Sequence, residues 1–334
     1  MKALIYETAN TIDNFGIQLR EIAEPTVRDD DVLVEVRAIG VNPGEAFVRQ
    51  VKSAEAGGYV LLGWEFAGVV VSVGRNVKRF KKGDRVFGTG DISRDGAYAE
   101  RVAVDHRIVA KIPDNVSFVD AASAAVGALT AYDAMFRYQG QLPPDIKTVL
   151  IIGGAGAIGS LGIQLLKTTT KSRVIASAST QESTDWVRKM GADLVVDHFG
   201  DVPAQLAEAG IKEVDFVLSL AATAQNFGWL ASVVRPYGHI AFTDVVPPLD
   251  ISHLSPLGIK APSLHMQMMF SRIVTGSQPE LQGLFLDKLG TYLGEGVIKP
   301  IVTKQLNGLT VESMETAHKL IEKQRTIGKI VIAV

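Results

Sequence analysis

Three glycines in the middle of the chain, Gly154, Gly156 and Gly159, have the G-x-G-x-x-G spacing that is typical of a loop binding a dinucleotide. The first position allows a tight turn, the second lets the backbone come close to a pyrophosphate, and the third lets a helix pack on a strand. The N–H groups and the dipole at the start of the following helix then hold the anion. The backbone expected to cradle the pyrophosphate is that of Gly154, Ala155, Gly156, Ala157, Ile158 and Gly159.

The segments on both sides of these glycines have the character that the motif requires. Four apolar residues at 149–152 predict a strand that is buried on both faces. The segment 160–170 is rich in leucine and isoleucine and contains no proline, so it predicts a helix. Glycine-rich turns also close ordinary strand–helix connections, but the flanking strand and helix favour dinucleotide binding.

The second strand of this unit, expected at 173–177, indicates which dinucleotide binds. An acidic residue roughly 20 residues beyond the glycines would bond the ribose hydroxyls and repel a 2′-phosphate. Here Ser177 and Ser179 stand in that region, and no carboxylate precedes Glu182. The sequence therefore favours NADPH over NADH. Three basic residues are candidate partners for the phosphate: Arg173, Lys189 and His198.

Strands and helices alternate between residues 149 and 243, which predicts a parallel sheet with helices on both faces. Ligands of such sheets bind at the carboxyl ends of the strands. Two further strands are expected at 214–219 and 239–243, and their ends either flank the nicotinamide half of the cofactor or merely begin loops. These ends are Ser219, Leu220, Ala221, Phe242 and Thr243.

The segments before and after this unit have a different character. Residues 1–112 contain short β segments separated by glycine turns, as in a compact β-barrel. The tail from about residue 271 mixes helices and strands, and we expect it to rejoin the first domain. The chain is thus predicted to be an α/β protein with a discontinuous domain at 1–119 and 271–334 and a dinucleotide-binding domain at 120–270.

Composition narrows the classes of protein. The 334 residues have a formal net charge of −2 and scattered Lys and Arg, so binding to nucleic acid or to an anionic membrane is not predicted. No signal peptide is visible and the apolar runs are too short to span a bilayer, so we expect a cytoplasmic protein. The absence of cysteine excludes disulfides, thiolate zinc sites and cysteine nucleophiles.

Several short stretches along nearly the whole chain carry a resemblance to a known family. They include Gly40-Val41-Asn42-Pro43, Gly63-Trp64-Glu65-Phe66, Lys82-Gly83-Asp84-Arg85, Gly96-Ala97-Tyr98 and Gly328-Lys329-Ile330-Val331. With them the chain resembles the medium-chain dehydrogenase/reductase superfamily, in its zinc-free quinone oxidoreductase branch, similar to zeta-crystallin. The segment 263–272 looks like a bacterial subgroup labelled zinc-type alcohol dehydrogenase-like. The resemblance implies a GroES-like β-barrel catalytic domain and a Rossmann domain.

The chain departs from the zinc alcohol dehydrogenases of this superfamily. Those proteins place a cysteine where Asn42 stands and a histidine where Trp64 stands. Catalytic zinc needs three protein ligands, which Glu65 alone does not supply, and the six histidines are too dispersed to show ligand spacing. We therefore expect no metal site.

The resemblance implies a set of residues around the substrate. Asn42 is implied to face the nicotinamide, where its amide would bond a carbonyl oxygen, although Asn-Pro is also a common turn. Phe47 stands where relatives often carry a tyrosine, so this chain has no tyrosine at that position to donate a proton. Phe47, Tyr59 and Trp64 are implied to line a cleft suited to flat substrates, and a Tyr59 hydroxyl could replace the missing one. Thr130 either lies near the nicotinamide and ribose or begins a helix.

Three more residues have implied roles near the cofactor. Lys329 is implied to contact the cofactor, and His198 stands where relatives carry a tyrosine near the adenosine. Glu65 is interpreted as a buried structural carboxylate rather than an acid or base.

The favoured function is zinc-independent, NADPH-dependent transfer of hydride to quinones or α,β-unsaturated carbonyl compounds. With no Lewis acid to polarise a substrate, acceptors that take hydride readily are preferred. An enoyl-thioester reductase and a non-catalytic NADPH-binding or sensing protein are the alternatives. The resemblance also implies a homodimer that pairs through residues 261–268, at the edge of the nucleotide sheet.

Overall fold

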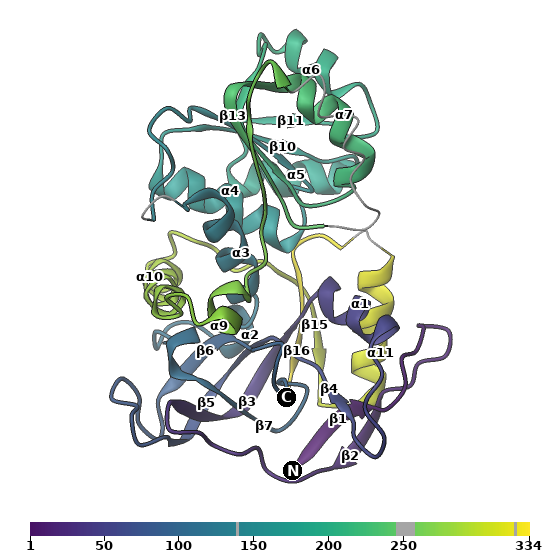
Figure 1. Ribbon diagram of the computed structural model, residues 1–334, viewed down its shortest axis with the longest axis vertical. Coiled ribbons are helices and arrows are strands. Elements are labelled where there is room, and N and C mark those ends of the chain that lie inside the picture. Colours follow the sequence, from purple (N-terminus) through teal and green to yellow (C-terminus); the bar gives the residue numbers. More distant parts are fainter. Residues whose placement is uncertain (138–139, 245–257, 324–325) are drawn as a thin grey trace. The chain divides into compact units, whose positions relative to one another are not determined.

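The computed structural model describes residues 1–137, 140–244, 258–323 and 326–334, and the chain divides into two compact units (Figure 1). The first contains Met1–Val126 and Phe270–Val334, and the second contains Gly127–Met269. The first unit runs to residue 126 instead of the expected 119, because the short helix α2 (Phe118–Ala121) packs on strands of that unit. Among the described residues, no helix combines the length and apolarity needed to cross a membrane.

The first unit is built on a seven-stranded sheet with the order β15-β16-β3-β5-β6-β8, to which β7 adds by pairing with β3, and on a three-stranded sheet with the order β2-β1-β4. The C-terminal strand β16 pairs with β3, so the tail of the chain joins the sheet of the first residues. The strands of this unit are β1 (Lys2–Tyr6), β2 (Gln18–Glu21), β3 (Asp31–Val41), β4 (Val60–Leu61), β5 (Glu65–Val73), β6 (Arg85–Thr89), β7 (Arg101–Asp105), β8 (Val109–Lys111), β15 (Val302–Asn307) and β16 (Lys329–Ala333).

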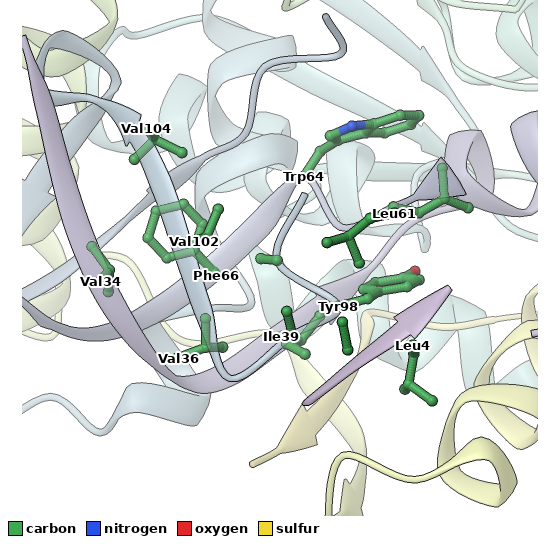
Figure 2. Packing of buried hydrophobic residues seen from close by; sticks show 14 of the residues in the cluster. Leu4, Val34, Val36, Ile39, Leu61, Trp64, Phe66, Tyr98, Val102 and Val104 are labelled. Carbon is green, nitrogen blue, oxygen red and sulfur yellow. The ribbon is translucent and has the colours of Figure 1, made fainter. Parts of the chain in front are cut away.

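Apolar side chains from these strands fill the core of the first unit. Val34 and Val36 of β3 lie close to Phe66 of β5 and to Val102 of β7 in the packing that Figure 2 shows. The described residues of this unit also form five further helical segments, and among them α1 and α11 pack on each other (Figure 1). They are α1 (Pro43–Val51), the 3₁₀ turn η1 (His106–Ile108), α9 (Ser271–Thr275), α10 (Glu280–Gly294) and α11 (Val311–Glu322).

The second unit is a parallel six-stranded sheet with the order β11-β10-β9-β12-β13-β14. Its strands are β9 (Thr148–Ile152), β10 (Arg173–Ser177), β11 (Leu194–Val196), β12 (Val214–Ser219), β13 (Val234–Phe242) and β14 (Ser263–Met266). Its helices are α3 (Ala125–Met135), α4 (Ala157–Thr169), α5 (Gln181–Met190), α6 (Val202–Glu208) and α7 (Thr223–Val233). The strand order reverses between β9 and β12, which is where a doubly wound sheet binds a dinucleotide.

The predicted α/β architecture, with a β-rich GroES-like unit and a parallel-sheet unit, is confirmed. The alanine-rich segment 121–125 joins two helices, because α2 ends at Ala121 and α3 starts at Ala125. Ser117 accepts a hydrogen bond from the Asp120 N–H and so begins α2, as its position before that helix predicts.

Candidate active site

The loop between β9 and α4 is shaped by four glycines rather than three. Gly153 has φ +80°, and its carbonyl oxygen accepts a hydrogen bond from the Gly156 N–H at 3.2 Å, so the tight turn begins at Gly153 and contains Gly154. A Cβ at Gly154 would lie 2.8 Å from the Cβ of Ala176 on the neighbouring strand β10. A Cβ at Gly159 would lie 2.5 Å from the Gly153 carbonyl oxygen. Gly154 and Gly159 are therefore required by the packing of the loop against β10 and α4.

Gly156 differs from its neighbours in this loop. It is the N-cap of the 13-residue helix α4, and a Cβ there would meet just the Gly153 carbonyl oxygen, at an ordinary 3.6 Å. The packing of the protein itself therefore leaves room at Gly156, beside the free N–H groups of a helix start. This arrangement fits the pyrophosphate of a dinucleotide, because a bound anion would occupy the space that a side chain would otherwise fill.

The end of β10 is tied to the glycine loop. The Ser177 hydroxyl accepts a hydrogen bond from the Gly153 N–H at 3.0 Å, and its side chain is buried. The next residues include Ser179 and the N-cap Thr180, and no carboxylate stands between them and Glu182. Arg173 begins β10, at the opposite end of the strand from Ser177. Arg173 is therefore a poor partner for a phosphate at the carboxyl end.

His198 follows β11 at the same edge of the sheet. The side chain is partly buried, and its Nδ1 has no hydrogen-bond partner among the described residues. Burial lowers the pKa of His198, so its imidazole is neutral near pH 7. A neutral ring with a free nitrogen suits contact with an adenosine better than charge pairing with a phosphate.

The carboxyl ends of β9, β12 and β13 lie side by side. The register pairs Ile152 with Ser219 and Ser219 with Phe242. Leu220 and Ala221 lie next to the glycine turn, because a Cβ at Gly153 would be 3.4 Å from the Leu220 Cβ and 3.6 Å from the Ala221 Cβ. The structure thus brings the predicted segments 219–221 and 242–243 to the edge that carries the glycine loop.

In the first unit, Asn42 is held where β3 ends and α1 begins. It is the N-cap of α1, followed by Pro43 at the first helical position, where a missing N–H costs nothing. Its backbone N–H donates to the Glu45 Oε2 at 2.6 Å. The residue is 9% exposed, and its side chain donates from Nδ2 to the Gly40 carbonyl oxygen at 3.2 Å. Asn42 therefore has a fixed backbone and a nearly buried amide.

A buried ion pair lies next to Asn42. The Lys329 Nζ is 2.5 Å from the Glu65 Oε2, and their side chains are 2% and 0% exposed. Lys329 also donates to the Asn42 Oδ1. The register explains the meeting, because Ile330 of β16 pairs with Val41 of β3 and so Lys329 comes opposite Asn42. The Glu65 Oε1 accepts a hydrogen bond from the Val126 N–H at 2.7 Å.

Gly40 makes room for this pair. A Cβ at Gly40 would lie 2.7 Å from the Glu65 Oε2 and 2.2 Å from the Ala122 carbonyl oxygen. Any larger residue there would displace the carboxylate that balances Lys329. The glycine in the Gly40-Val41-Asn42-Pro43 stretch is thus explained by the close approach of both the Ala122 backbone and the Glu65 carboxylate.

A second buried carboxylate, Glu45, connects Asn42 to Trp64. Besides the Asn42 N–H, it accepts hydrogen bonds from the Trp64 N–H at 2.7 Å and from the Tyr98 hydroxyl at 2.9 Å. Burial raises the pKa of Glu45, and these three donors oppose the rise. The Tyr98 hydroxyl also lies 3.4 Å from the His318 Nε2. Glu45 therefore fixes the backbone of both Asn42 and Trp64.

His318 and Tyr98 close this network on the core side. Burial, together with the nearby Arg49 charge, lowers the pKa of His318 to about 3, so the imidazole is neutral. Burial also raises the pKa of Tyr98 well above its ordinary value. Figure 2 shows the Tyr98 ring among the aliphatic side chains, close to Leu61. Both residues are thus uncharged at neutral pH.

The residues that the resemblance places near the substrate differ in how far they are exposed to solvent. Trp64 is buried and packs edge-to-face on Phe270, with ring centroids 5.3 Å apart. Phe47 on α1 is 50% exposed. The Tyr59 hydroxyl donates to the Asp95 Oδ2 at 3.2 Å, and burial and that carboxylate raise the pKa of Tyr59. Thr130 belongs to the second unit and is buried in the interior of α3, so its interpretation as a helix start is wrong.

The residues that support Asn42 were not predicted from the sequence. Glu45 had a readable signal, because an acidic residue three positions after an N-cap commonly bonds back to the cap N–H. Tyr98 and His318 had none, since they lie 53 and 220 residues from the groups they contact. Among the described residues, no three His, Asp or Glu side chains form a group that could hold a metal ion. A metal-free reaction stays a prediction.

Two family models match the chain. One describes the alcohol dehydrogenase GroES-like domain and matches residues 28–114, and the other describes a zinc-binding dehydrogenase and matches residues 190–332. Both matched stretches carry residues of the charged cluster, with Asn42 and Glu65 in the first and Lys329 in the second.

Similar proteins cover nearly the whole chain. A zinc-type alcohol dehydrogenase-like protein of Staphylococcus aureus (strain MRSA252) is 35% identical over 99% of both chains. The 2-methylene-furan-3-one reductase of Solanum lycopersicum is 29% identical, and the NADPH-dependent alkenal/one oxidoreductase of Arabidopsis thaliana chloroplasts is 28% identical, each over 99% of this chain and 79% of the relative. The structure of Escherichia coli quinone oxidoreductase complexed with NADPH has the same fold, with a TM-score of 0.85, 21% identity and full coverage of both chains.

Proposed function

Because the chain belongs to the medium-chain dehydrogenase/reductase superfamily, we propose that it is an NADPH-dependent oxidoreductase that delivers hydride to quinones or α,β-unsaturated carbonyl compounds without a metal. The observation that carries this proposal is the buried group of Asn42, Lys329 and Glu65. An ammonium group balances the carboxylate there, and a neutral amide stands ready to bond an oxygen. The names of two relatives, an alkenal/one oxidoreductase and a furanone reductase, point to the same chemistry.

The strength of the hydrogen-bond donor in the site determines which class of compound can accept the hydride. When an enone or a quinone takes hydride at carbon, negative charge moves to its carbonyl oxygen. A hydrogen-bond donor at that oxygen lowers the barrier, because it stabilises the charge that develops in the transition state. An unactivated aldehyde or ketone would need a stronger electrophile than an amide. The site therefore suits acceptors that already delocalise the charge.

Each part of the protein has a defined task in this reaction. NADPH, when bound, supplies the hydride. The backbone of the β9–α4 loop would hold the pyrophosphate, with Gly156 left open for it. The Asn42 Nδ2 would donate to the acceptor oxygen, and Trp64, packed on Phe270, would exclude water. The complete reduction adds one hydride and one proton to the acceptor.

NADPH is proposed over NADH for two reasons. The region after β10 offers hydroxyl groups and no carboxylate before Glu182, so nothing there repels a 2′-phosphate. The Ser177 hydroxyl is engaged with the Gly153 N–H, which leaves Ser179 and the start of α5 as the groups that would meet the phosphate. The preference is expected to be modest, because no arginine or lysine stands beside these serines.

The test is consumption of NADPH by the purified protein with a panel of quinones and conjugated enones, and NADH in parallel. We expect turnover with at least one class and a lower KM for NADPH. The Asn42→Ala variant should lower kcat about 100-fold, as loss of an oxyanion donor does, with an unchanged Kd for NADPH. Unchanged turnover in this variant would remove Asn42 from the mechanism, and tight NADPH binding without turnover would favour a non-catalytic or thioester-specific protein.

We also propose that the protein is a homodimer that pairs through β14. This strand is at the edge of the six-stranded sheet, and Leu264 and Met266 on it are exposed. An exposed apolar edge strand that is not covered invites pairing with a second copy. Light scattering should give twice the 35.8 kDa mass of one chain. The Leu264→Lys substitution should shift the protein toward the monomer.

A further inference from the structure

The two ends of the Asn42 side-chain amide have opposite hydrogen-bonding properties, and only one of them can bond the carbonyl oxygen of a substrate. The Oδ1 end accepts hydrogen bonds and the Nδ2 end donates them. The Asn42 Oδ1 takes a hydrogen bond from the Lys329 ammonium, and the Nδ2 donates to the Gly40 carbonyl oxygen. Since an ammonium group can only donate and a carbonyl can only accept, both ends of the amide are assigned by their partners.

We propose that Lys329 is a positioning residue that acts through Asn42 and holds the amide with its N–H₂ group available to the substrate oxygen. The proposal rests on the function proposed above. The Nδ2 has two N–H bonds, and Gly40 is its one acceptor among the described residues. The second N–H is the group that would meet the acceptor. In the flipped orientation, two donors would face each other at Lys329 and an oxygen would face the substrate oxygen.

The surroundings of Lys329 prevent it from leaving Asn42. Its ammonium lies 2.5 Å from the Glu65 Oε2, and the Glu65 Oε1 is held by the Val126 N–H. Both charged side chains are buried, and both rise from strands that flank β3. The Lys329 ammonium therefore has a fixed counter-ion on one side and the amide on the other.

This role differs from the cofactor contact that the family resemblance implies for Lys329. A lysine that binds the cofactor contributes to the affinity for NADPH, whatever residue stands at 42. A lysine that acts through Asn42 changes kcat, and only while Asn42 is present. The two roles are therefore separable by a double-mutant cycle.

The cycle should keep the charge balanced, because removing one partner of a buried ion pair leaves the other uncompensated. The charge-free variant combines Lys329→Met with Glu65→Gln, in which the glutamine can still accept from the Val126 N–H. This pair of substitutions is made in the wild-type protein and in the Asn42→Ala variant, and kcat, KM and the Kd for NADPH are measured for all four proteins. Glu65→Gln alone keeps the lysine beside Asn42 but leaves its charge uncompensated, so it is compared with the other variants after urea denaturation has shown that it is folded.

We expect the charge-free variant to lower kcat about 10-fold or more in the wild-type background and less than about twofold in the Asn42→Ala background, because coupled residues are not additive. The Kd for NADPH should stay within about twofold. Glu65→Gln alone should retain more of kcat than the charge-free variant. Equal losses of kcat in both backgrounds, or a loss confined to NADPH affinity, would overturn the proposal.

A spectroscopic measurement separates this proposal from the proposed function. In protein labelled with ¹³C at asparagine, the Asn42 Cγ signal should shift when Lys329 is replaced in the charge-free variant, and much less in Glu65→Gln. If the wild-type protein reduces none of the acceptors, or if Asn42→Ala leaves kcat unchanged, the proposed function fails while this signal still reports the contact. An unshifted Cγ signal would show that Lys329 does not hold the amide, even in an active enzyme.

Discussion

The glycine loop of the second unit and the charged cluster of the first unit are built in opposite ways. The loop is continuous in sequence, from Gly153 to Gly159, and its shape is set by backbone packing against β10 and α4. The cluster joins Asn42 to Lys329, which are 287 residues apart, and it depends on the balance of buried charges. A substitution in the loop depends on whether the local packing leaves room for a Cβ. The charged cluster, by contrast, is stable only when both members of its buried ion pair are present. Substitutions in the two regions should therefore fail for different reasons.

The largest effect is expected at the buried ion pair. Lys329→Met alone leaves the Glu65 carboxylate buried without a counter-ion, which should lower the free energy of unfolding by about 3–5 kcal/mol. The added Glu65→Gln substitution should restore most of that stability, because two neutral side chains then replace two charges. Urea denaturation of both variants measures the difference. Equal stability of the single and double variants would mean that the charges are not coupled.

The pH dependence of stability tests the uncharged part of the same network. The pKa of His318 is about 3 in the folded protein, below its ordinary value, so between pH 6.5 and pH 3 the unfolded chain binds a proton that the folded chain does not. The free energy of unfolding should therefore decrease as the pH is lowered, by about 2 kcal/mol between pH 6.5 and pH 4.5.

The control for this titration is His318→Gln, which keeps a polar side chain near Tyr98 but does not titrate. Its free energy of unfolding should change less than that of the wild-type protein over the same range. Denaturation curves at several pH values measure both proteins. Parallel pH profiles would show that His318 is protonated in the folded state.

Two glycines of the loop should respond differently to the same change. Gly159→Ala places a Cβ 2.5 Å from a backbone oxygen and should lower the free energy of unfolding by about 1–3 kcal/mol. Gly156→Ala meets an ordinary 3.6 Å contact, so the protein should keep its stability while its affinity for NADPH falls. Thermal unfolding and fluorescence titration with NADPH separate the two effects. Unchanged NADPH affinity in Gly156→Ala would remove the loop from cofactor binding.

The smallest effect is expected at the hydrogen bond between the loop and β10. Ser177→Ala leaves the Gly153 N–H without its side-chain acceptor and should lower the free energy of unfolding by about 1 kcal/mol. The affinity for NADPH should fall slightly, because the turn that begins the loop loses one restraint. Ser179→Ala, at a more exposed position, is the matched control. A larger loss of stability at Ser179 would reverse the assignment of these two serines.

Much of the fold followed from patterns of sequence. The alternation of strands and helices between residues 149 and 243 predicted the parallel sheet, and the glycine-punctuated β segments predicted the first unit. The very short strands β2 and β4 were not predicted. Four exposed residues in β2 and two residues in β4 carry too little alternation of polar and apolar side chains to mark a strand.

The sites were predictable to different degrees. The glycine spacing located the β9–α4 loop but did not indicate Gly153, because its φ of +80° depends on the path of the chain and not on the spacing. Asn42, Trp64 and Lys329 were singled out by resemblance, but no pattern indicated that Lys329 contacts Asn42. That contact exists because β16 pairs with β3 in one register.

The sequence by itself determined the local features of this protein: the strand–glycine–helix unit, the absence of thiol ligands, and the lack of a carboxylate after β10. Each of these depends on residues that are neighbours in the chain, so spacing and residue type suffice to predict them. The tertiary structure alone decided which groups share a buried environment. Glu65 and Lys329 are ordinary surface residue types until the sheet buries both, and burial makes each require the other.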